Sequence, residues 1–257
     1  GTISSAVVTT STHDAVGILV EAGASLPTVN NSGRISAQVQ GYDGDAVAFR
    51  DLSGTVTNFT NSSRVTAGYV DNDTTDNITS GGGQAIALDL SHSASGVTLT
   101  QNDTVDNARI IGDVLLGAGN DQFNILSGIV IGDVSFGGGS DTLNITTADL
   151  TGDTTFGGSG ATVALNATRM TGALSLGAAS GSLSFTNQST YNGAITNTGA
   201  GAVSLTANNS TVNNSGSGTL TLSSMSLSNG TNLGLVVNNA RISGNTPIFN
   251  VTGTADI

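Results

Sequence analysis

Aspartates that recur at a fixed spacing are the residues of this sequence best placed to do chemistry. Asp113, Asp133 and Asp153 each follow a glycine, and about 20 residues separate one from the next. At equivalent positions of stacked strands they would lie about 4.8 Å apart, and like charges that face each other across strands are destabilising. A bound metal ion would relieve this repulsion, and so would side chains that point outward into water. We expect the outward arrangement, because Ala173 and Ala194 follow at the same position.

Two glycine-rich segments contain one further aspartate each. They are residues 117–123 (Gly-Ala-Gly-Asn-Asp-Gln-Phe) and 137–143 (Gly-Gly-Gly-Ser-Asp-Thr-Leu). Both resemble the calcium-binding nonapeptide Gly-Gly-x-Gly-x-Asp-x-U-x, in which loops of successive stacked turns share calcium. The resemblance implies calcium at Asp121 and Asp141, and no other cofactor is expected. In that family the motif recurs every nine residues, whereas here it occurs twice, so the alternative is a glycine-rich corner with a solvated aspartate.

Few residues of this sequence are suited to other kinds of catalysis. The only histidines are His13 and His92, Glu21 is the only glutamate, and the chain has neither lysine nor cysteine. Glycoside hydrolysis uses two carboxyl groups at a defined separation, and serine hydrolases show a Gly-x-Ser-x-Gly turn that is absent here. We expect both histidines to lie in exposed turns. The sequence therefore favours a protein that is not an enzyme.

The aspartates belong to a repeat of about 20 residues. Residues 110–125 (Ile-Ile-Gly-Asp-Val-Leu-Leu-Gly-Ala-Gly-Asn-Asp-Gln-Phe-Asn-Ile) match residues 130–145, and three further copies extend to residue 206. Apolar residues alternate within each copy, which is typical of a strand with one buried face. One coil cannot bury such a face alone, whereas stacked coils form a continuous core. The repeat predicts an all-β fold: a right-handed single-stranded parallel β-helix, or β-solenoid, with about 20 residues per coil.

Four columns of inward side chains should build the core, and a short third strand is expected near residues 127–131. The columns are Val114/Val134/Thr154/Leu174/Ile195, Leu116/Phe136/Phe156/Leu176, Phe123/Leu143/Val163/Leu183/Val203 and Ile125/Ile145/Leu165/Phe185/Leu205. The fifth copy slips by one residue at Gly193 and is expected to recover at Val203 and Leu205. Asn124 and Asn144 share one register position, where stacked amides can form a hydrogen-bonded ladder.

The flanking regions are less regular, yet the whole chain reads as one continuous solenoid of residues 1–257. We expect irregular coils with longer turns in 1–109, the regular repeats in 110–206 and shorter coils in 207–257. Residues 29–37 resemble 57–67, and 46–48 resemble 85–87. Residues 70–83 are the candidate for an excursion from the rod. About 12 coils at about 4.8 Å per strand would give a rod of roughly 60 Å.

The charge of the chain argues against nucleic acids and anionic membrane surfaces as partners. The net charge is −12, and the six basic residues are scattered along the sequence: Arg34, Arg50, Arg64, Arg109, Arg169 and Arg241. Without a basic patch we expect no nucleic-acid partner and no attraction to an anionic membrane surface. No run approaches the roughly 18 apolar residues of a membrane span, so direct insertion of this segment is not expected either.

Residues 111–121 and 29–37 resemble the passenger domains of bacterial autotransporters, which are usually parallel β-helices secreted through an outer-membrane barrel. The resemblance implies a segment at the surface of a Gram-negative cell or outside it, attached to the outer membrane through a region beyond this sequence. It also implies a role in adhesion, aggregation or surface display. Glycans, cell surfaces or copies of the same chain would be the partners, with a homo-oligomer or fibre as one form.

Two alternatives remain open from the sequence. The chain could be a structural subunit of an extracellular fibre or surface layer, since solenoid ends associate unless they are capped. It could also be a polysaccharide-active enzyme of the β-helix type, since one fold supports many functions. The first and last residues of the sequence both have a pattern typical of a strand, so we expect it to be a segment of a longer protein.

Overall fold

Parallel strands make up all the regular structure in the described part of the chain. The computed structural model describes residues 1–9, 13–41, 44–70, 83–103, 108–199, 201–235 and 247–257. Within these ranges every strand pairing is parallel, and the strands form three sheets. The chain visits the three sheets in turn, as in β10, β11 and β12, and then begins the next coil. The all-β fold class, a parallel β-helix, is confirmed.

In the part of the chain that the structure describes, the three sheets contain ten, eight and ten strands. The strands of the first sheet are β1 (Thr2–Thr9), β4 (Arg34–Gly41), β7 (Arg64–Val70), β10 (Arg109–Ile111), β13 (Ile129–Ile131), β16 (Asp149–Thr151), β19 (Arg169–Thr171), β22 (Thr190–Gly193), β25 (Thr211–Asn214) and β27 (Asn232–Leu235). The strands of the second sheet are β2 (Ala15–Val20), β5 (Ala46–Asp51), β8 (Ala85–Asp89), β11 (Asp113–Leu115), β14 (Val134–Ser135), β17 (Thr154–Thr155), β20 (Leu174–Ser175) and β23 (Ile195–Thr196). The strands of the third sheet are β3 (Thr28–Asn31), β6 (Asn58–Asn61), β9 (Thr98–Gln101), β12 (Gln122–Ile125), β15 (Ser140–Thr146), β18 (Gly160–Asn166), β21 (Ser180–Thr186), β24 (Val203–Asn208), β26 (Leu220–Ser228) and β28 (Phe249–Asp256).

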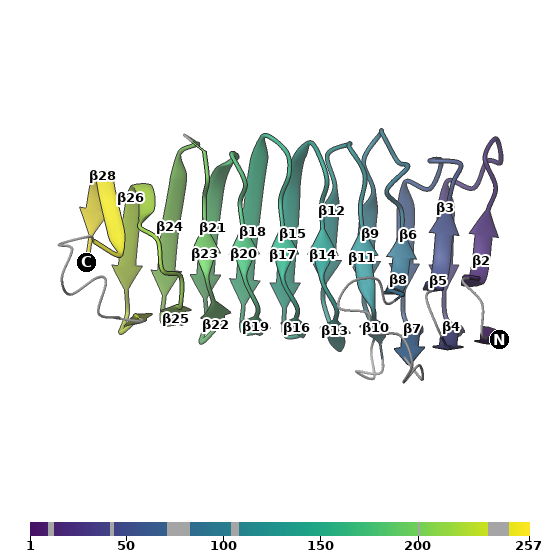
Figure 1. Ribbon diagram of the computed structural model, residues 1–257. Coiled ribbons are helices and arrows are strands. Elements are labelled where there is room, and N and C mark those ends of the chain that lie inside the picture. The colour runs from purple at the N-terminus through teal and green to yellow at the C-terminus, as the bar shows by residue number, and fades with distance from the viewer. Residues whose placement is uncertain (10–12, 42–43, 71–82, 104–107, 200, 236–246) are drawn as a thin grey trace.

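The coils stack into a rod that has the two termini at opposite ends (Figure 1). Ten strands in the first sheet, at about 4.8 Å per strand, correspond to roughly 45 Å. The expectation of about 12 coils and roughly 60 Å was too high, because the early coils use more residues. Arg34 pairs with Arg64, and Arg64 with Arg109. Of the candidate excursion 70–83, residues 71–82 lie outside the described residues.

The middle coils repeat at a constant spacing of 20 residues, as in the pairing of Ile129 with Asp149 and of Asp149 with Arg169. Glycine makes the corner between the first and second sheets possible. Gly152 has a φ of +148°, and a Cβ there would lie 2.0 Å from the carbonyl oxygen of Gly132 on the coil below. Only glycine fits such a close approach of two backbones at positive φ, so the glycine column sets the path of the regular coils.

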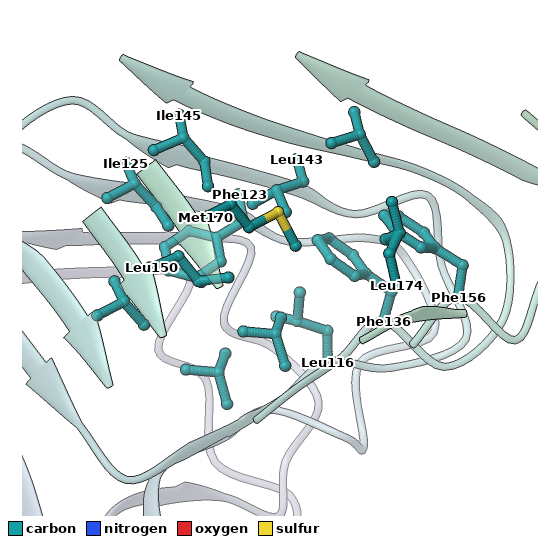
Figure 2. Close-up of a cluster of buried hydrophobic side chains, with 14 of the residues drawn as sticks. Leu116, Phe123, Ile125, Phe136, Leu143, Ile145, Leu150, Phe156, Met170 and Leu174 are labelled. Atoms are coloured by element: carbon teal, nitrogen blue, oxygen red, sulfur yellow. The ribbon is translucent and has the colours of Figure 1, made fainter. Parts of the chain in front are cut away.

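The core is continuous along the rod and follows the expected columns through the first four copies. The first column pairs in register from Val114 through Val134, Thr154 and Leu174 to Ile195. In the neighbouring column the rings of Phe136 and Phe156 stack with centroids 4.5 Å apart and planes 5° apart. Figure 2 shows these rings beside the buried leucine and isoleucine side chains that fill the interior.

The expected register of the fifth copy was wrong by two residues in the third sheet. Leu183 pairs with Leu205, and Phe185 with Ala207, whereas Val203 lies opposite Gly181. The slip begins in the first sheet, where Met170 pairs with Tyr191. It persists in the second sheet, where Leu174 pairs with Ile195. It is not recovered before β24, because the corner that follows β23 is longer than its counterpart in the regular copies.

The earlier and later coils differ from the regular ones. The two resemblances in the flank correspond to stacked strands, since Val29 pairs with Phe59 and Ala46 with Ala85. Near the other end Leu220 pairs with Phe249, so this coil uses more residues than a regular one, not fewer. No helix in the described part of the chain is long and apolar enough to cross a membrane.

Candidate functional site

Asp121 and Asp141, the residues that resemble calcium ligands, occupy neighbouring inward positions at the start of the third sheet. Strand β15 places Asp141, Leu143 and Ile145 on its buried face, and Asp141 pairs with the small Ala161 on the next coil. The exposed fractions of Asp121 and Asp141 are 2% and 1%. The alternative of a solvated aspartate in a glycine-rich corner was therefore wrong, because the side chains turn into the core.

Each of these carboxylates holds the preceding coil through a backbone hydrogen bond. The Val97 N–H donates to Asp121 Oδ1 at 2.7 Å, and the Asp121 N–H donates to Asp141 Oδ1 at 2.8 Å. Oδ2 of both side chains is buried and has no hydrogen-bond partner among the described residues. The two carboxyl groups thus have one oxygen in a coil-to-coil bond and one oxygen enclosed without a partner.

Burial shifts the protonation of this pair. Loss of solvation raises the pKa of Asp141 from 3.8 to about 6, against the opposing effect of the hydrogen bond from Asp121. Loss of solvation likewise raises the pKa of Asp121 to about 6, and the nearby charge of Asp141 raises it further, while the Val97 N–H acts in the opposite direction. A charged carboxylate that is buried without a cation is costly, so this pair binds protons at mildly acidic pH.

Calcium binding at Asp121 and Asp141 stays a prediction. Calcium takes six to eight oxygen ligands, and the pair offers its two unpartnered Oδ2 atoms for that purpose. In the described part of the chain, no group of three or more acidic, histidine or cysteine side chains converges in a way that could hold a metal ion. Backbone carbonyls and water would therefore have to supply most of the coordination.

The second aspartate column behaves as expected for outward side chains. Asp133 and Asp153 are exposed and Asp113 is half-buried. Asp113 Oδ1 accepts the N–H of Asp133 at 2.9 Å, and Asp133 Oδ1 accepts the N–H of Asp153 at 2.8 Å. The column then ends at Ala173, whose N–H donates to Asp153 at 2.7 Å. Partial burial raises the pKa of Asp113, and the charge of Asp133 adds to this effect.

A separate set of outward aspartates joins the irregular coils, which the sequence repeat did not reveal; it is not in register with Asp113, which pairs with Ile86. Asp14 Oδ1 accepts the Asp45 N–H at 3.0 Å, and Asp45 Oδ1 accepts the Gln84 N–H at 2.8 Å. Each of these aspartates comes directly before a strand of the second sheet. Their common position before a strand could have identified this set in the sequence, but the unequal coil lengths obscured the spacing. The set therefore has a structural role: it ties one corner of the solenoid to the next.

Arg50 forms the ion pairs found among the described residues. Its side chain contacts Asp14 at 3.2 Å and Asp89 at 3.1 Å, and these partners lie on the coils before and after it. The sequence contained no signal for this triad, because its members are 36 and 39 residues from Arg50. The two histidines are exposed, as expected. His13 precedes β2 and His92 follows β8.

Amide ladders connect the coils both outside and inside the solenoid. The expected outer ladder is confirmed, since Asn144 Nδ2 donates to Asn124 Oδ1 at 2.9 Å. A buried ladder was missed: Asn31 Nδ2 donates to Asn61 Oδ1 at 2.8 Å, and Asn61 Nδ2 donates to Gln101 Oε1 at 3.2 Å. The resemblance of residues 29–37 to 57–67 already placed its two asparagines at one position.

The description of the arginines as scattered was wrong for three of them. Arg34, Arg64 and Arg109 pair in register on β4, β7 and β10 of the first sheet, and all three are exposed. We call these three residues the arginine column. The early coils differ in length, so the three arginines recur at unequal spacing in the sequence. Only the stacking of the coils brings them together.

No protein-family model, curated protein or solved structure matches this chain. The assignment as a parallel β-helix therefore depends on the strand pairing and the core of the chain itself.

Proposed function

We propose that the chain is a non-catalytic β-solenoid that displays an adhesive surface outside the cell, as a segment of an autotransporter passenger would. One observation carries the proposal: the carboxylate and amide side chains that could do chemistry instead form hydrogen bonds that join one coil to the next. Asp133 binds a backbone N–H of the next coil and Asp141 one of the preceding coil, and Asn61 joins its neighbours on both sides. Carboxylates and amides engaged in this way support a scaffold rather than an active site.

The outward faces are suited to contacts that repeat along a rod. In β18, for example, the buried Ala161, Val163 and Leu165 alternate with residues that face outward, and the neighbouring strands β15 and β21 follow the same register. Such a face offers similar polar groups at each strand spacing. A partner with its own repeat, such as a glycan chain or a second solenoid, can engage many weak contacts at once, which raises avidity without any deep pocket.

We further propose a location on the surface of a Gram-negative cell. The support is the resemblance of residues 111–121 and 29–37 to autotransporter passengers, together with the parallel β-helix fold that such passengers usually have. Attachment would be through a region outside this sequence. Labelling of intact cells with an antibody against this chain tests the location: a signal is expected without permeabilisation, and a signal that appears only after lysis would contradict it.

Adhesion and catalysis can be separated with the purified chain. Beads coated with the folded chain should aggregate or attach to glycan-coated surfaces, whereas beads coated with heat-denatured chain should not. Incubation with acidic polysaccharides should release no new reducing or unsaturated ends, and such release would favour the β-helix enzyme instead. Sedimentation of the uncoated chain tests the fibre alternative, because concentration-dependent polymers would favour a structural subunit.

A further inference from the structure

The arginine column is a concentration of positive charge on a chain of net charge −12. Its three members occupy the first position of β4, β7 and β10, so their side chains project from adjacent strands at about 4.8 Å intervals. Like charges that face one another across strands are destabilising. The stacking therefore has a cost unless an anion lies against the guanidinium groups.

No acidic side chain in the described part of the chain neutralises the arginine column. The ion pairs found there are those of Arg50 with Asp14 and Asp89. A contrast lies further along the same sheet, where Asp149 pairs in register with Arg169. Arg169 thus has a carboxylate on the neighbouring strand, whereas Arg64 has an arginine on each side.

A polar hollow lies beside the column on the first sheet. It has a volume of about 210 Å³, and the side chains of Arg34, Ser36, Gln38 and Thr66 contribute to its lining. The space above Gly68 is open, since a Cβ at this position would meet only the Cγ of Gln38, at 3.9 Å. Guanidinium, hydroxyl and amide groups are thus gathered at one place on the outer face.

We propose that the arginine column and this hollow bind a linear acidic polysaccharide that crosses the strands along the solenoid axis. Guanidinium groups bind carboxylate or sulfate through paired hydrogen bonds, and the hydroxyl and amide groups of the hollow suit the sugar hydroxyls. A polymer with acidic groups on successive sugars contacts several coils at once. This inference rests on the proposed function, since it names the ligand class of the adhesive surface.

Acidic polysaccharides fit the column better than nucleic acid does. Three cations neutralise few phosphates, and the affinity of a protein for nucleic acid rises with the number of phosphates that it neutralises. The net charge of −12 repels a long polyanion over the remaining surface. A glycan offsets this repulsion through neutral hydroxyl contacts in the hollow.

Binding of labelled polygalacturonate and dextran sulfate to the full chain, measured by fluorescence anisotropy with a calcium chelator present, tests the inference. The two probes separate carboxylate from sulfate as the preferred acidic group. Neutral dextran and single-stranded DNA serve as comparison ligands. Arg64→Gln should weaken binding of the preferred polysaccharide about tenfold, which corresponds to one charge-assisted contact. The matched control is Arg169→Gln, which removes the same charge from the same position of the same sheet and should change the affinity less than about twofold.

Three results would overturn the inference. They are equal binding by the native chain and by the combined Arg34, Arg64 and Arg109→Gln variant, no binding of either acidic polysaccharide, and DNA binding that equals polysaccharide binding. The substituted side chains are exposed, so the combined variant should keep the native circular dichroism spectrum. Bead aggregation that persists in this variant would contradict the inference alone. Polysaccharide binding without any aggregation or attachment would contradict the proposed function alone.

Discussion

Oδ1 of Asp141 accepts the backbone N–H of Asp121 at 2.8 Å. The two residues occupy equivalent positions on successive coils, and both point into the core. Positions of this kind elsewhere in the third sheet hold apolar or small residues, such as Val97 and Ala161. The pair therefore places two titratable groups where a solenoid normally buries hydrocarbon, and its consequences can be measured.

The first prediction concerns the pH dependence of stability. Each carboxyl has its pKa raised from 3.8 to about 6 in the folded chain, so the folded state binds more protons than the unfolded state between these values. The free energy of unfolding should therefore fall as the pH rises from about 4 to about 6, and this contribution stays lost above pH 6. Asp121→Asn and Asp141→Asn together should remove this slope and raise the free energy of unfolding at pH 7.5 by roughly 1–3 kcal/mol.

Urea denaturation at a series of pH values measures this effect. The asparagine keeps the Oδ1 acceptor for the neighbouring N–H, so the coil-to-coil bond is retained. Asp149→Asn, compared with each single variant of the pair, controls for the loss of one negative charge at an exposed position. If the native chain and the double variant showed the same pH profile, the buried pair would not be the source of the slope.

The second prediction concerns calcium. If calcium binds between the Oδ2 atoms of Asp121 and Asp141, millimolar calcium should raise the Tm of the native chain at pH 7.5, because a ligand that binds only the folded state stabilises it. The double asparagine variant should show no such increase. Thermal melting with calcium, with magnesium and with a chelator provides the comparison. An unchanged Tm of the native chain in calcium would end this hypothesis.

The third prediction compares the two amide ladders. Asn61 is fully buried and bonds to the side chains of Asn31 and Gln101. Its replacement by alanine removes the donor to Gln101 Oε1 and the acceptor of the Ser63 N–H, whereas Asn31 Nδ2 keeps its bond to the Arg64 carbonyl oxygen. Each buried group left without a partner costs about 1–3 kcal/mol. We expect Asn61→Ala to lower the free energy of unfolding by about 3 kcal/mol or more.

Asn144→Ala is the matched control for the ladder. Asn144 is half-buried and makes one bond of this kind, to Asn124, and water can replace that partner. Its loss should cost about 1 kcal/mol or less. Chemical denaturation of both variants gives the two values, and equal losses would show that burial does not set the strength of these ladders.

The fourth prediction concerns the stacked rings of the core. Phe156 is fully buried against Phe136, so Phe156→Ala should leave a cavity and lower the free energy of unfolding by about 3–5 kcal/mol. Phe156→Leu retains most of the volume and should cost clearly less. Thermal and urea denaturation measure both variants. A smaller loss for alanine than for leucine would contradict the packing seen in Figure 2.

Part of the fold could be read directly from the repeat. Alternation of apolar residues identified the inward columns, and the constant spacing identified the stacking of Val114 on Val134. This worked because a strand has a strict period of two and equal coils keep equivalent residues in register. The register failed at Val203, because a longer corner changes the length of a coil without changing the local alternation.

The sequence by itself determined which residues face inward and outward in the regular coils, because this depends only on local periodicity. It also placed the aspartates of the glycine-rich corners in one register. The tertiary structure alone decided that Asp121 and Asp141 turn into the core, since burial depends on how the corner bends. It alone aligned Arg34, Arg64 and Arg109, because coils of unequal length are brought into register only by the hydrogen bonds between neighbouring strands.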